Sequence, residues 1–163
     1  MDASLKSKKP ATAGQKGAAD GQTISKIGII GAGQMGNGIA HVVALAGYDV
    51  GIYDLKTEAA QKAISIIEKN MARQVQRGII KDADMSAALK RIRIVSDIKS
   101  FGDADLVIEA ATEDESVKRK IFSDLCPVLS KTALLASNTS SISIPRLAST
   151  TDRPERFIGM HFM

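Results

Sequence analysis

The sequence has 163 residues, of which 44% are hydrophobic and 25% charged, the composition of one soluble globular domain. The net charge is +4, but only 4% of the residues are aromatic and no Lys/Arg run exceeds three residues. The sequence therefore lacks the features of a nucleic-acid-binding protein. No apolar stretch approaches the ~18 residues that span a bilayer. We therefore expect binding neither to nucleic acid nor to a membrane.

Few residues are available for disulfides or metal ligation. Cys126 is the only cysteine, so no disulfide forms within the chain and a reducing compartment is favoured. His41 and His161 are the only histidines and there is no CxxC, so we expect no metal site. Residues 1–24 are rich in Lys, Ala, Gly, Ser and Thr, which predicts a mobile tail. The tail lacks the apolar core of a signal peptide and the arginines of a presequence, so we expect a cytoplasmic location.

The first elements after the tail form one compact unit. Residues 26–30 are a short apolar run that ends in glycines, the pattern of a buried parallel strand. A helix is predicted from Gln34 to Leu45 and is closed by Gly47. A second strand at residues 49–53 ends at Asp54. Strand, helix and strand in about 30 residues are the unit that crosses over right-handed.

The stretch from about residue 57 to 91 interrupts this alternation with two helical patterns. The first helix stops at Gly78 and the second starts near Asp82, which predicts a helical hairpin inserted between strands. Residues 57–93 carry eight basic and four acidic side chains, so their net charge equals that of the whole chain. We call this hairpin the basic arm.

Strands and helices then alternate again. A helix is predicted from about Glu115 to Leu125, and strands are predicted at residues 92–95, 106–110, 133–137 and 156–161. This alternation predicts an α/β fold of the Rossmann type, a doubly wound and mainly parallel sheet over residues 25–163.

A glycine-rich motif joins the first strand to its helix. Its residues are Gly31-Ala32-Gly33-Gln34-Met35-Gly36. In a dinucleotide-binding turn, the first glycine allows the tight bend, the second lets the backbone approach the pyrophosphate, and the third lets the helix pack closely. The N–H groups at the start of the helix then face the phosphates. The motif predicts a dinucleotide site, and a purely structural turn is the alternative.

An acidic residue follows the second strand. Asp54 lies 23 residues beyond Gly31, near the spacing of ~20 at which a carboxylate binds the ribose hydroxyls. Such a carboxylate repels a 2′-phosphate, so NAD is predicted as the cofactor rather than NADP. A solvated aspartate at a strand end is the alternative interpretation.

Two further groups of residues lie after late strands. His161 stands at the expected carboxyl end of the sixth strand, where it is a candidate base, although a lone histidine is more often structural. His41 lies within the first helix and is interpreted as a packing or surface residue. The segment Ser137–Ser141 either caps the helix that starts near Ile144 or supplies hydroxyls to a substrate oxygen. The residues alone do not decide between these roles.

Together, the glycine motif, the Ser137–Ser141 segment and Gly159-Met160-His161-Phe162 resemble the 3-hydroxyacyl-CoA dehydrogenases. The similarity runs from about Lys26 to Met163. It implies an oxidoreductase that converts an L-3-hydroxyacyl-CoA to the 3-ketoacyl-CoA with NAD, or the reverse, with 3-hydroxybutyryl-CoA and acetoacetyl-CoA as the expected pair.

The resemblance also assigns roles to individual residues. Asp54 matches the residue that binds the adenosine ribose, and Glu113 and Lys118 match further NAD contacts. Ser140 matches the serine that hydrogen-bonds the 3-oxygen of the substrate, and His161 matches the general base.

The basic arm resembles the part of the family that holds the CoA adenine and phosphates. Asn70 and Arg77 are the matching positions, and arginine suits phosphate as a bidentate donor. The resemblance therefore implies an acyl-CoA partner.

Family members are nearly twice as long as the folded part of this chain, which stops two residues after His161. We therefore expect the helical C-terminal domain to be absent, together with the glutamate that orients the histidine and the contacts of a homodimer. A truncated chain of this kind is predicted to bind NAD with little turnover. A non-catalytic dinucleotide-binding module and a related NAD-dependent dehydrogenase of polyol acids remain the alternatives.

Overall fold

The computed structural model describes residues 18, 19 and 21–163. Strands β1 (Ala18–Ala19) and β2 (Gln22–Thr23) pair antiparallel. Most of the segment expected to be a mobile tail, residues 1–24, lies outside the described residues.

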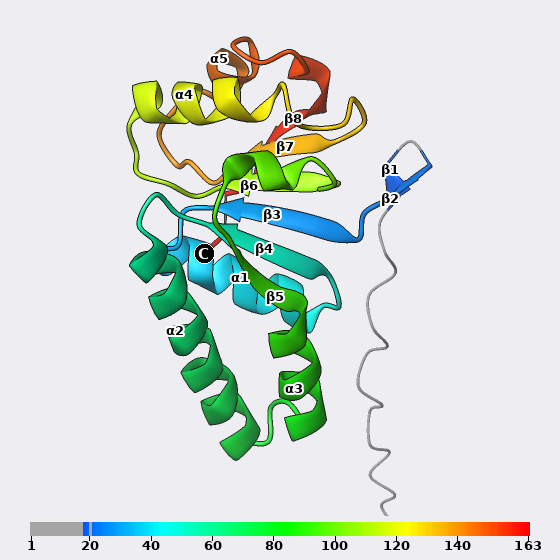
Figure 1. Cartoon of the computed structure of the whole chain (residues 1–163), viewed down its shortest axis with the longest axis vertical. Coiled ribbons are helices and arrows are strands. Elements are labelled where there is room, and N and C mark those ends of the chain that lie inside the picture. Colours follow the sequence, from blue (N-terminus) through cyan, green and yellow to red (C-terminus); the bar gives the residue numbers. More distant parts are fainter. Residues whose placement is uncertain (1–17, 20) are drawn as a thin grey trace, which may run out of the picture.

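The main sheet is parallel, with helices on both faces (Figure 1). Its strands are β3 (Lys26–Ile30), β4 (Asp49–Tyr53), β5 (Ile92–Val95), β6 (Leu106–Glu109), β7 (Leu134–Ser137) and β8 (Phe157–Gly159). The helices are α1 (Gln34–Leu45), α2 (Thr57–Gln76), α3 (Asp82–Arg91), α4 (Glu115–Leu125) and α5 (Ile144–Ala148). Short 3-10 turns lie at Ile98–Phe101 and Pro154–Arg156.

These elements confirm the predicted Rossmann-type α/β fold with an inserted helical hairpin. The predicted end of the last strand was wrong. A strand was expected over residues 156–161, but β8 ends at Gly159, so His161 lies two residues beyond the strand.

The order of strands in the sheet is β5-β4-β3-β6-β7-β8, and every neighbouring pair is parallel. The chain winds from β3 toward one edge and from β6 toward the other, so the direction reverses between these two strands. The loops that leave their carboxyl ends therefore diverge, and the crevice between them is where such sheets bind ligands.

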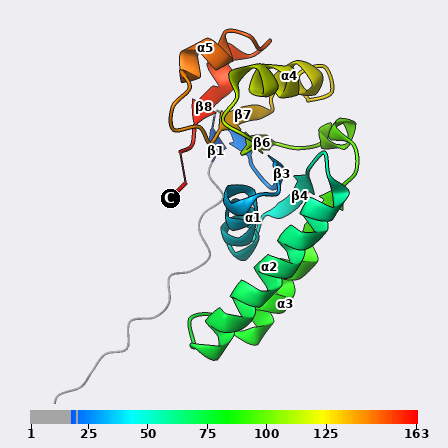
Figure 2. The same cartoon turned by 90° about the vertical axis from the view of Figure 1, so that its left-hand side faces the viewer.

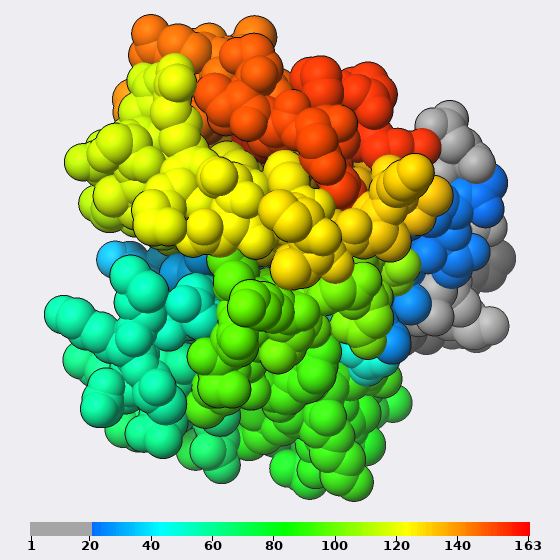
Figure 3. All heavy atoms as spheres, turned by 45° about the horizontal axis from the view of Figure 1, so that its top comes forward, coloured from blue at the N-terminus to red at the C-terminus, as the bar shows by residue number. Residues whose placement is uncertain are grey.

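Both faces of the sheet are buried, which explains the nearly continuous apolar strands. Helix α1 and the arm α2–α3 cover one face through a cluster that includes Ile29, Ile52 and Met71. Helices α4 and α5 cover the other face around Phe122 and Leu135. The arm extends away from the sheet (Figure 2). On the face seen in Figure 3, it occupies the half opposite to α4, α5 and β8. Among the described residues, no helix has the length and apolarity needed to cross a membrane.

A 3-10 turn takes the place of a crossover helix between β5 and β6. Its Phe101 is buried against the middle of β3 and β4. A Cβ atom at Gly28 would lie 2.7 Å from the Phe101 ring, and one at Gly51 would lie 3.1 Å from it. The aromatic ring thus fills the space that side chains at these two strand positions would need.

Candidate functional site

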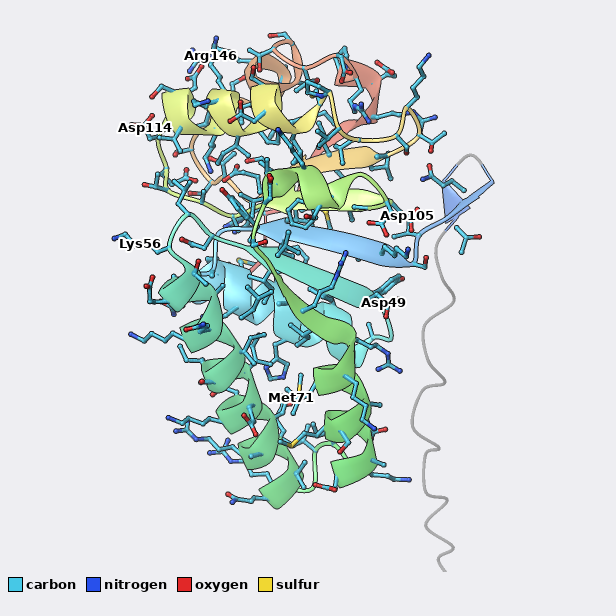
Figure 4. All side chains as sticks on the ribbon, viewed as in Figure 1. Asp49, Lys56, Met71, Asp105, Asp114 and Arg146 are labelled. Atoms are coloured by element: carbon cyan, nitrogen blue, oxygen red, sulfur yellow. The ribbon has the colours of Figure 1, made fainter. Side chains whose placement is uncertain are left out.

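The segments singled out in the sequence all follow strands at the same edge of the sheet. The final residues of all six strands lie in one row of the pairing register, namely Val95, Tyr53, Ile30, Glu109, Ser137 and Gly159. Lys56 and Asp114, from the loops after β4 and β6, lie on this carboxyl side, whereas Asp49 and Asp105 lie at the opposite edge (Figure 4). The glycine motif, Asp54, Glu113, Ser140 and His161 therefore come together at one edge.

The three motif glycines are required for different physical reasons. Gly31 has φ +100°, and a Cβ there would lie 2.6 Å from the Ala110 carbonyl oxygen. A Cβ at Gly36 would lie 1.7 Å from the Gly31 carbonyl oxygen, so the start of α1 packs directly on the loop. A Cβ at Gly33 would meet no atom within 4 Å. Protein packing thus demands the first and third glycines, whereas the second borders open space.

The start of α1 provides hydrogen-bond donors at that open space. Gly33 is the N-cap residue, no side chain caps the helix, and its first turn has no acidic residue. Gln34 and Met35 are exposed there. Free N–H groups at the positive end of a helix suit a phosphate group. Together with the bare backbone at Gly33, they fit a dinucleotide pyrophosphate.

Asp54 ties the glycine loop to the end of β4. Its Oδ2 accepts a hydrogen bond from the Ala32 N–H at 2.9 Å, and its Oδ1 accepts one from the Lys56 N–H at 2.9 Å. A carboxylate oxygen has two lone pairs, so each oxygen can still accept a hydrogen bond from a hydroxyl group. The side chain is half-buried, which leaves it accessible beside the loop.

A groove of about 480 Å³ runs between the glycine loop and α2. It is lined by Ala32, Gly33, Gln34, Asn37, Ala59, Lys62, Ile66 and Asn70. Asn70 therefore lies beside the cofactor loop, and Lys62 contributes a cation that sequence reasoning missed. Arg77, the residue after α2, is exposed further along the arm and does not line the groove.

A smaller hollow of about 280 Å³ lies at the opposite edge, among Lys26, Asp49 and Arg93. Parallel sheets of this type bind ligands at their carboxyl edge. The groove beside the glycine loop is therefore the stronger candidate for a ligand site.

A buried ion pair underlies the loops after β6 and β7. Lys118 and Glu109 have no exposed side-chain surface, and the Lys118 Nζ lies 2.7 Å from the Glu109 Oε2. The same Nζ lies 3.3 Å from the Oε1 of Glu113, which is 43% exposed. Lys118 was expected to touch NAD itself, but its ammonium is covered here, and of these three charged side chains Glu113 alone reaches the surface.

Glu113 in turn holds two hydroxyl side chains. Its Oε2 accepts hydrogen bonds from Thr139 and from Ser141, each at 2.7 Å. Although partial burial alone would raise the pKa of Glu113, these hydrogen bonds and the Lys118 ammonium together hold that pKa below its ordinary value of 4.5. Glu113 is therefore an ionised acceptor at neutral pH.

This arrangement predicts the pH dependence of the Glu113 carboxylate. Because its pKa is lower in the folded chain, ionised Glu113 stabilises the fold above the ordinary value of 4.5, and this contribution is lost as the pH falls through the folded pKa. In an NMR titration of the Glu113 carboxyl carbon, we expect a midpoint below 4.5. In Ser141→Ala, which lacks one donor, the midpoint should rise. A midpoint above 4.5 in the unaltered chain would contradict the network.

The structure separates the two roles considered for the Ser137–Ser141 segment. Helix α5 is capped by Ser143, whose Oγ accepts a hydrogen bond from the Arg146 N–H, so the segment is not the cap. Ser137 and Thr139 are buried, whereas Ser140 and Ser141 are exposed. Ser140 lies between the two residues that Glu113 holds and is itself exposed.

His161 is exposed, and its neighbours on both sides are fixed. The Met160 N–H donates to the Ser137 carbonyl at 3.0 Å, and the Phe162 N–H donates to the Asn138 Oδ1 at 2.7 Å. Asn138 therefore links the histidine segment to the serine loop, a role that sequence reasoning missed. The only signal available in the sequence was an amide side chain directly after the end of a buried strand.

His41 is a packing residue. It is buried between α1 and α2, where its Nε2 lies 3.0 Å from the Gln74 Oε1. Within residues 21–163, no three His, Cys, Asp or Glu side chains are grouped as they would be around a metal ion.

Comparison with known proteins agrees with this geometry. Residues 26–163 match the family described as 3-hydroxyacyl-CoA dehydrogenase, NAD binding domain. The chain belongs to this family. Its Rossmann domain is thus an NAD-binding domain of this family, and the predicted cofactor, NAD, is confirmed.

Individual relatives of the family support the same assignment. A 3-hydroxybutyryl-CoA dehydrogenase from Bradyrhizobium diazoefficiens is 54% identical over 140 residues, which are 86% of this chain and 48% of the relative. A 3-hydroxyadipyl-CoA dehydrogenase from Escherichia coli is 42% identical, over 85% of this chain and 29% of the relative. The crystal structure of an (S)-3-hydroxybutyryl-CoA dehydrogenase from Ralstonia eutropha superposes with a TM-score of 0.84 at 40% identity, covering 86% of this chain and 50% of that one. The chain therefore spans about half the length of the Bradyrhizobium and Ralstonia relatives.

Proposed function

We propose that the complete protein transfers hydride between an L-3-hydroxyacyl-CoA and NAD, with 3-hydroxybutyryl-CoA and acetoacetyl-CoA as the substrate pair. The observation that carries this proposal is the hydrogen bond between the Phe162 N–H and Asn138, which joins the His161 segment to the serine loop. It supports this function because it ties the segment of His161, the proposed base, to the loop of Ser140, the proposed hydroxyl donor. The names of the Bradyrhizobium and Ralstonia relatives support the choice of substrate.

We assign cofactor binding to the carboxyl ends of β3, β4 and β6. The N–H groups at Gly33, Gln34 and Met35 bind the pyrophosphate, and Gly31 and Gly36 allow the close packing that presents them. Asp54 accepts hydrogen bonds from the ribose hydroxyls through its remaining lone pairs. Glu113 is the further polar contact, fixed from below by Lys118.

We assign the acyl-CoA to the groove between the glycine loop and the arm. Asn70 and Lys62 line that groove, and Lys62 supplies positive charge for the phosphates of CoA. Arg77 lies further along the arm, where it suits a phosphate at the far end of the ligand.

In the reaction, His161 removes the proton from the 3-hydroxyl group, and Ser140 donates a hydrogen bond to the 3-oxygen. Histidine suits this task because it exchanges protons readily near neutral pH. The bound cofactor supplies the hydride acceptor. Residues 160 and 162 flanking the base are hydrogen-bonded, which keeps its backbone in place as the proton moves.

Replacement of His161 tests this assignment in the complete protein. We expect His161→Ala to lower kcat for acetoacetyl-CoA reduction by about 10²–10⁴-fold, because general acid–base catalysis is lost. NAD affinity should be unchanged, since the glycine loop is untouched. Turnover by His161→Ala at the unaltered rate would contradict the enzyme function.

Replacement of Arg77 tests the CoA site. Arg77→Gln should raise KM for the CoA substrate and leave kcat near the unaltered value. No effect of Arg77→Gln would favour a dehydrogenase that does not use CoA.

We further propose that the complete protein acts in the cytoplasm as a homodimer. The lone, buried Cys126 suits a reducing compartment. Sedimentation of the complete protein tests the dimer, and a monomer at micromolar concentration would contradict it.

A further inference from the structure

Glu109 is a buried charge to which neither the sequence nor the proposed reaction gives a role. It is the last residue of β6, has no exposed surface, and accepts hydrogen bonds from the Lys118 Nζ at 2.9 and 2.7 Å. The Ser137 Oγ–H donates to its Oε1 at 2.6 Å and the Ala111 N–H to its Oε2 at 2.7 Å. A carboxylate at this depth is costly to bury, and these donors match both of its oxygens.

The Glu109–Lys118 pair is connected to the protein surface through the carboxylate of Glu113. The Lys118 Nζ reaches Glu113, which holds the hydroxyls of Thr139 and Ser141 on either side of Ser140. Because Lys118 has no exposed surface, its ammonium is held by protein groups alone, namely Glu109 and Glu113. The position of the ammonium therefore depends on Glu109, and the position of Glu113 depends on that ammonium.

Glu109 also contacts the serine loop from below. The Asn138 N–H donates to the Glu109 carbonyl at 2.8 Å, next to the side-chain bond from Ser137. Ser137 and Asn138 are the two residues that accept the N–H groups of Met160 and Phe162. One buried residue thus contacts the loop of Ser140 directly and the loop of His161 through its neighbours.

We propose that Glu109 is a positioning residue. It fixes Lys118 and Ser137, and through them Glu113 and the hydrogen bonds of Asn138, so that Ser140 and His161 are held in one arrangement before any ligand binds. The catalytic purpose of this arrangement rests on the proposed function. How rigidly the two loops are held can be measured without a ligand.

Amide hydrogen exchange of the chain, measured by NMR, tests this proposal. The reporters are the N–H groups of Ile142, which donates to the Thr139 Oγ1, and of Phe162, which donates to Asn138. We expect Glu109→Gln to accelerate exchange at both by about tenfold or more beyond any change in the amides of α1, which report the loss of global stability. Asp124→Asn is the matched control, because it breaks an exposed ion pair with Lys120 on the same helix, and it should change neither reporter.

A double variant separates positioning from simple stabilisation. Glu109→Gln alone leaves the Lys118 ammonium buried beside a neutral amide, so it lowers stability whatever the role of Glu109. Glu109→Gln with Lys118→Met removes both charges, and we expect the free energy of unfolding to recover while exchange at Ile142 and Phe162 stays fast. Slow exchange in the double variant would overturn the proposal, as would unchanged exchange in Glu109→Gln.

If Glu109→Gln does not fold, exchange at Ile142 and Phe162 in the double variant is sufficient to test the positioning role.

NADH titration of the unaltered chain tests the proposed function separately. Absence of NADH binding would contradict the proposed function without altering the exchange result, whereas slow exchange in the double variant contradicts the positioning role alone.

Discussion

Replacing Gly36 with alanine is expected to abolish detectable NAD binding and to lower the free energy of unfolding by about 3 kcal/mol or more. The added Cβ would lie 1.7 Å from the Gly31 carbonyl oxygen, which is backbone and cannot rotate away. Helix α1 must then move off the loop, and the N–H groups at its start lose their alignment. Urea unfolding and NADH titration of the same preparation measure the two effects.

Two neighbouring glycines provide matched controls. Gly33→Ala should keep its stability within about 0.5 kcal/mol, because its Cβ meets no atom within 4 Å, yet it should weaken NADH binding at least ~10-fold by occupying the approach of the pyrophosphate. Gly38→Ala, inside α1 and equally open, should gain about 0.5–1 kcal/mol and bind NADH normally. Normal stability and NADH binding in Gly36→Ala would contradict the close packing of loop and helix.

Replacing Lys118 with methionine is expected to cost about 3–5 kcal/mol of stability. The substitution leaves the Glu109 carboxylate buried with no opposite charge, since both side chains of the pair are fully covered. Thermal and urea unfolding measure the loss.

Lys120 provides the control on the same helix. Its side chain is 76% exposed and pairs with Asp124, so Lys120→Met should change stability by no more than about 0.5 kcal/mol. Addition of Glu109→Gln to Lys118→Met should restore most of the lost stability, because neither charge is then buried alone. A Lys118→Met variant as stable as Lys120→Met would show that the pair is not buried in solution.

The part of the fold that depends on local pattern could be predicted closely. Residues 26–54 have apolar strands, a helix closed by Gly47, and glycines where the turn requires them, so each element is determined by its own sequence. Gly47 has φ +98° in the structure, as its place after α1 predicts. The alternation of strands and helices along the chain also predicted a parallel sheet, in which the strand ends lie along one edge.

Features that depend on contacts between distant elements could not be predicted. Phe101 fills the space above Gly28 and Gly51, which only the packing of a turn on two strands can show. Asn138 and Phe162 are 24 residues apart, so the sequence gives no sign of the hydrogen bond between them. Strand β8 also ends at Gly159, earlier than its apolar pattern suggests.

The pairing of Glu109 with Lys118 had a sequence signal that stands out only in retrospect. Glu109 ends an apolar run in a strand buried on both faces, and a charge at such a position needs a partner. Which lysine serves as that partner depends on how α4 lies on the sheet. The family resemblance alone placed Lys118 at the cofactor, whereas the structure shows its ammonium covered by protein.

Titration of the chain with NADH and, in parallel, with NADPH tests most directly whether the glycine loop and Asp54 form an NAD site. We expect saturable binding of one NADH per chain, with an affinity at least ~10-fold higher than that for NADPH, because the Asp54 carboxylate repels a 2′-phosphate. Absence of saturable NADH binding by the folded chain, or equal affinity for both dinucleotides, would contradict this account.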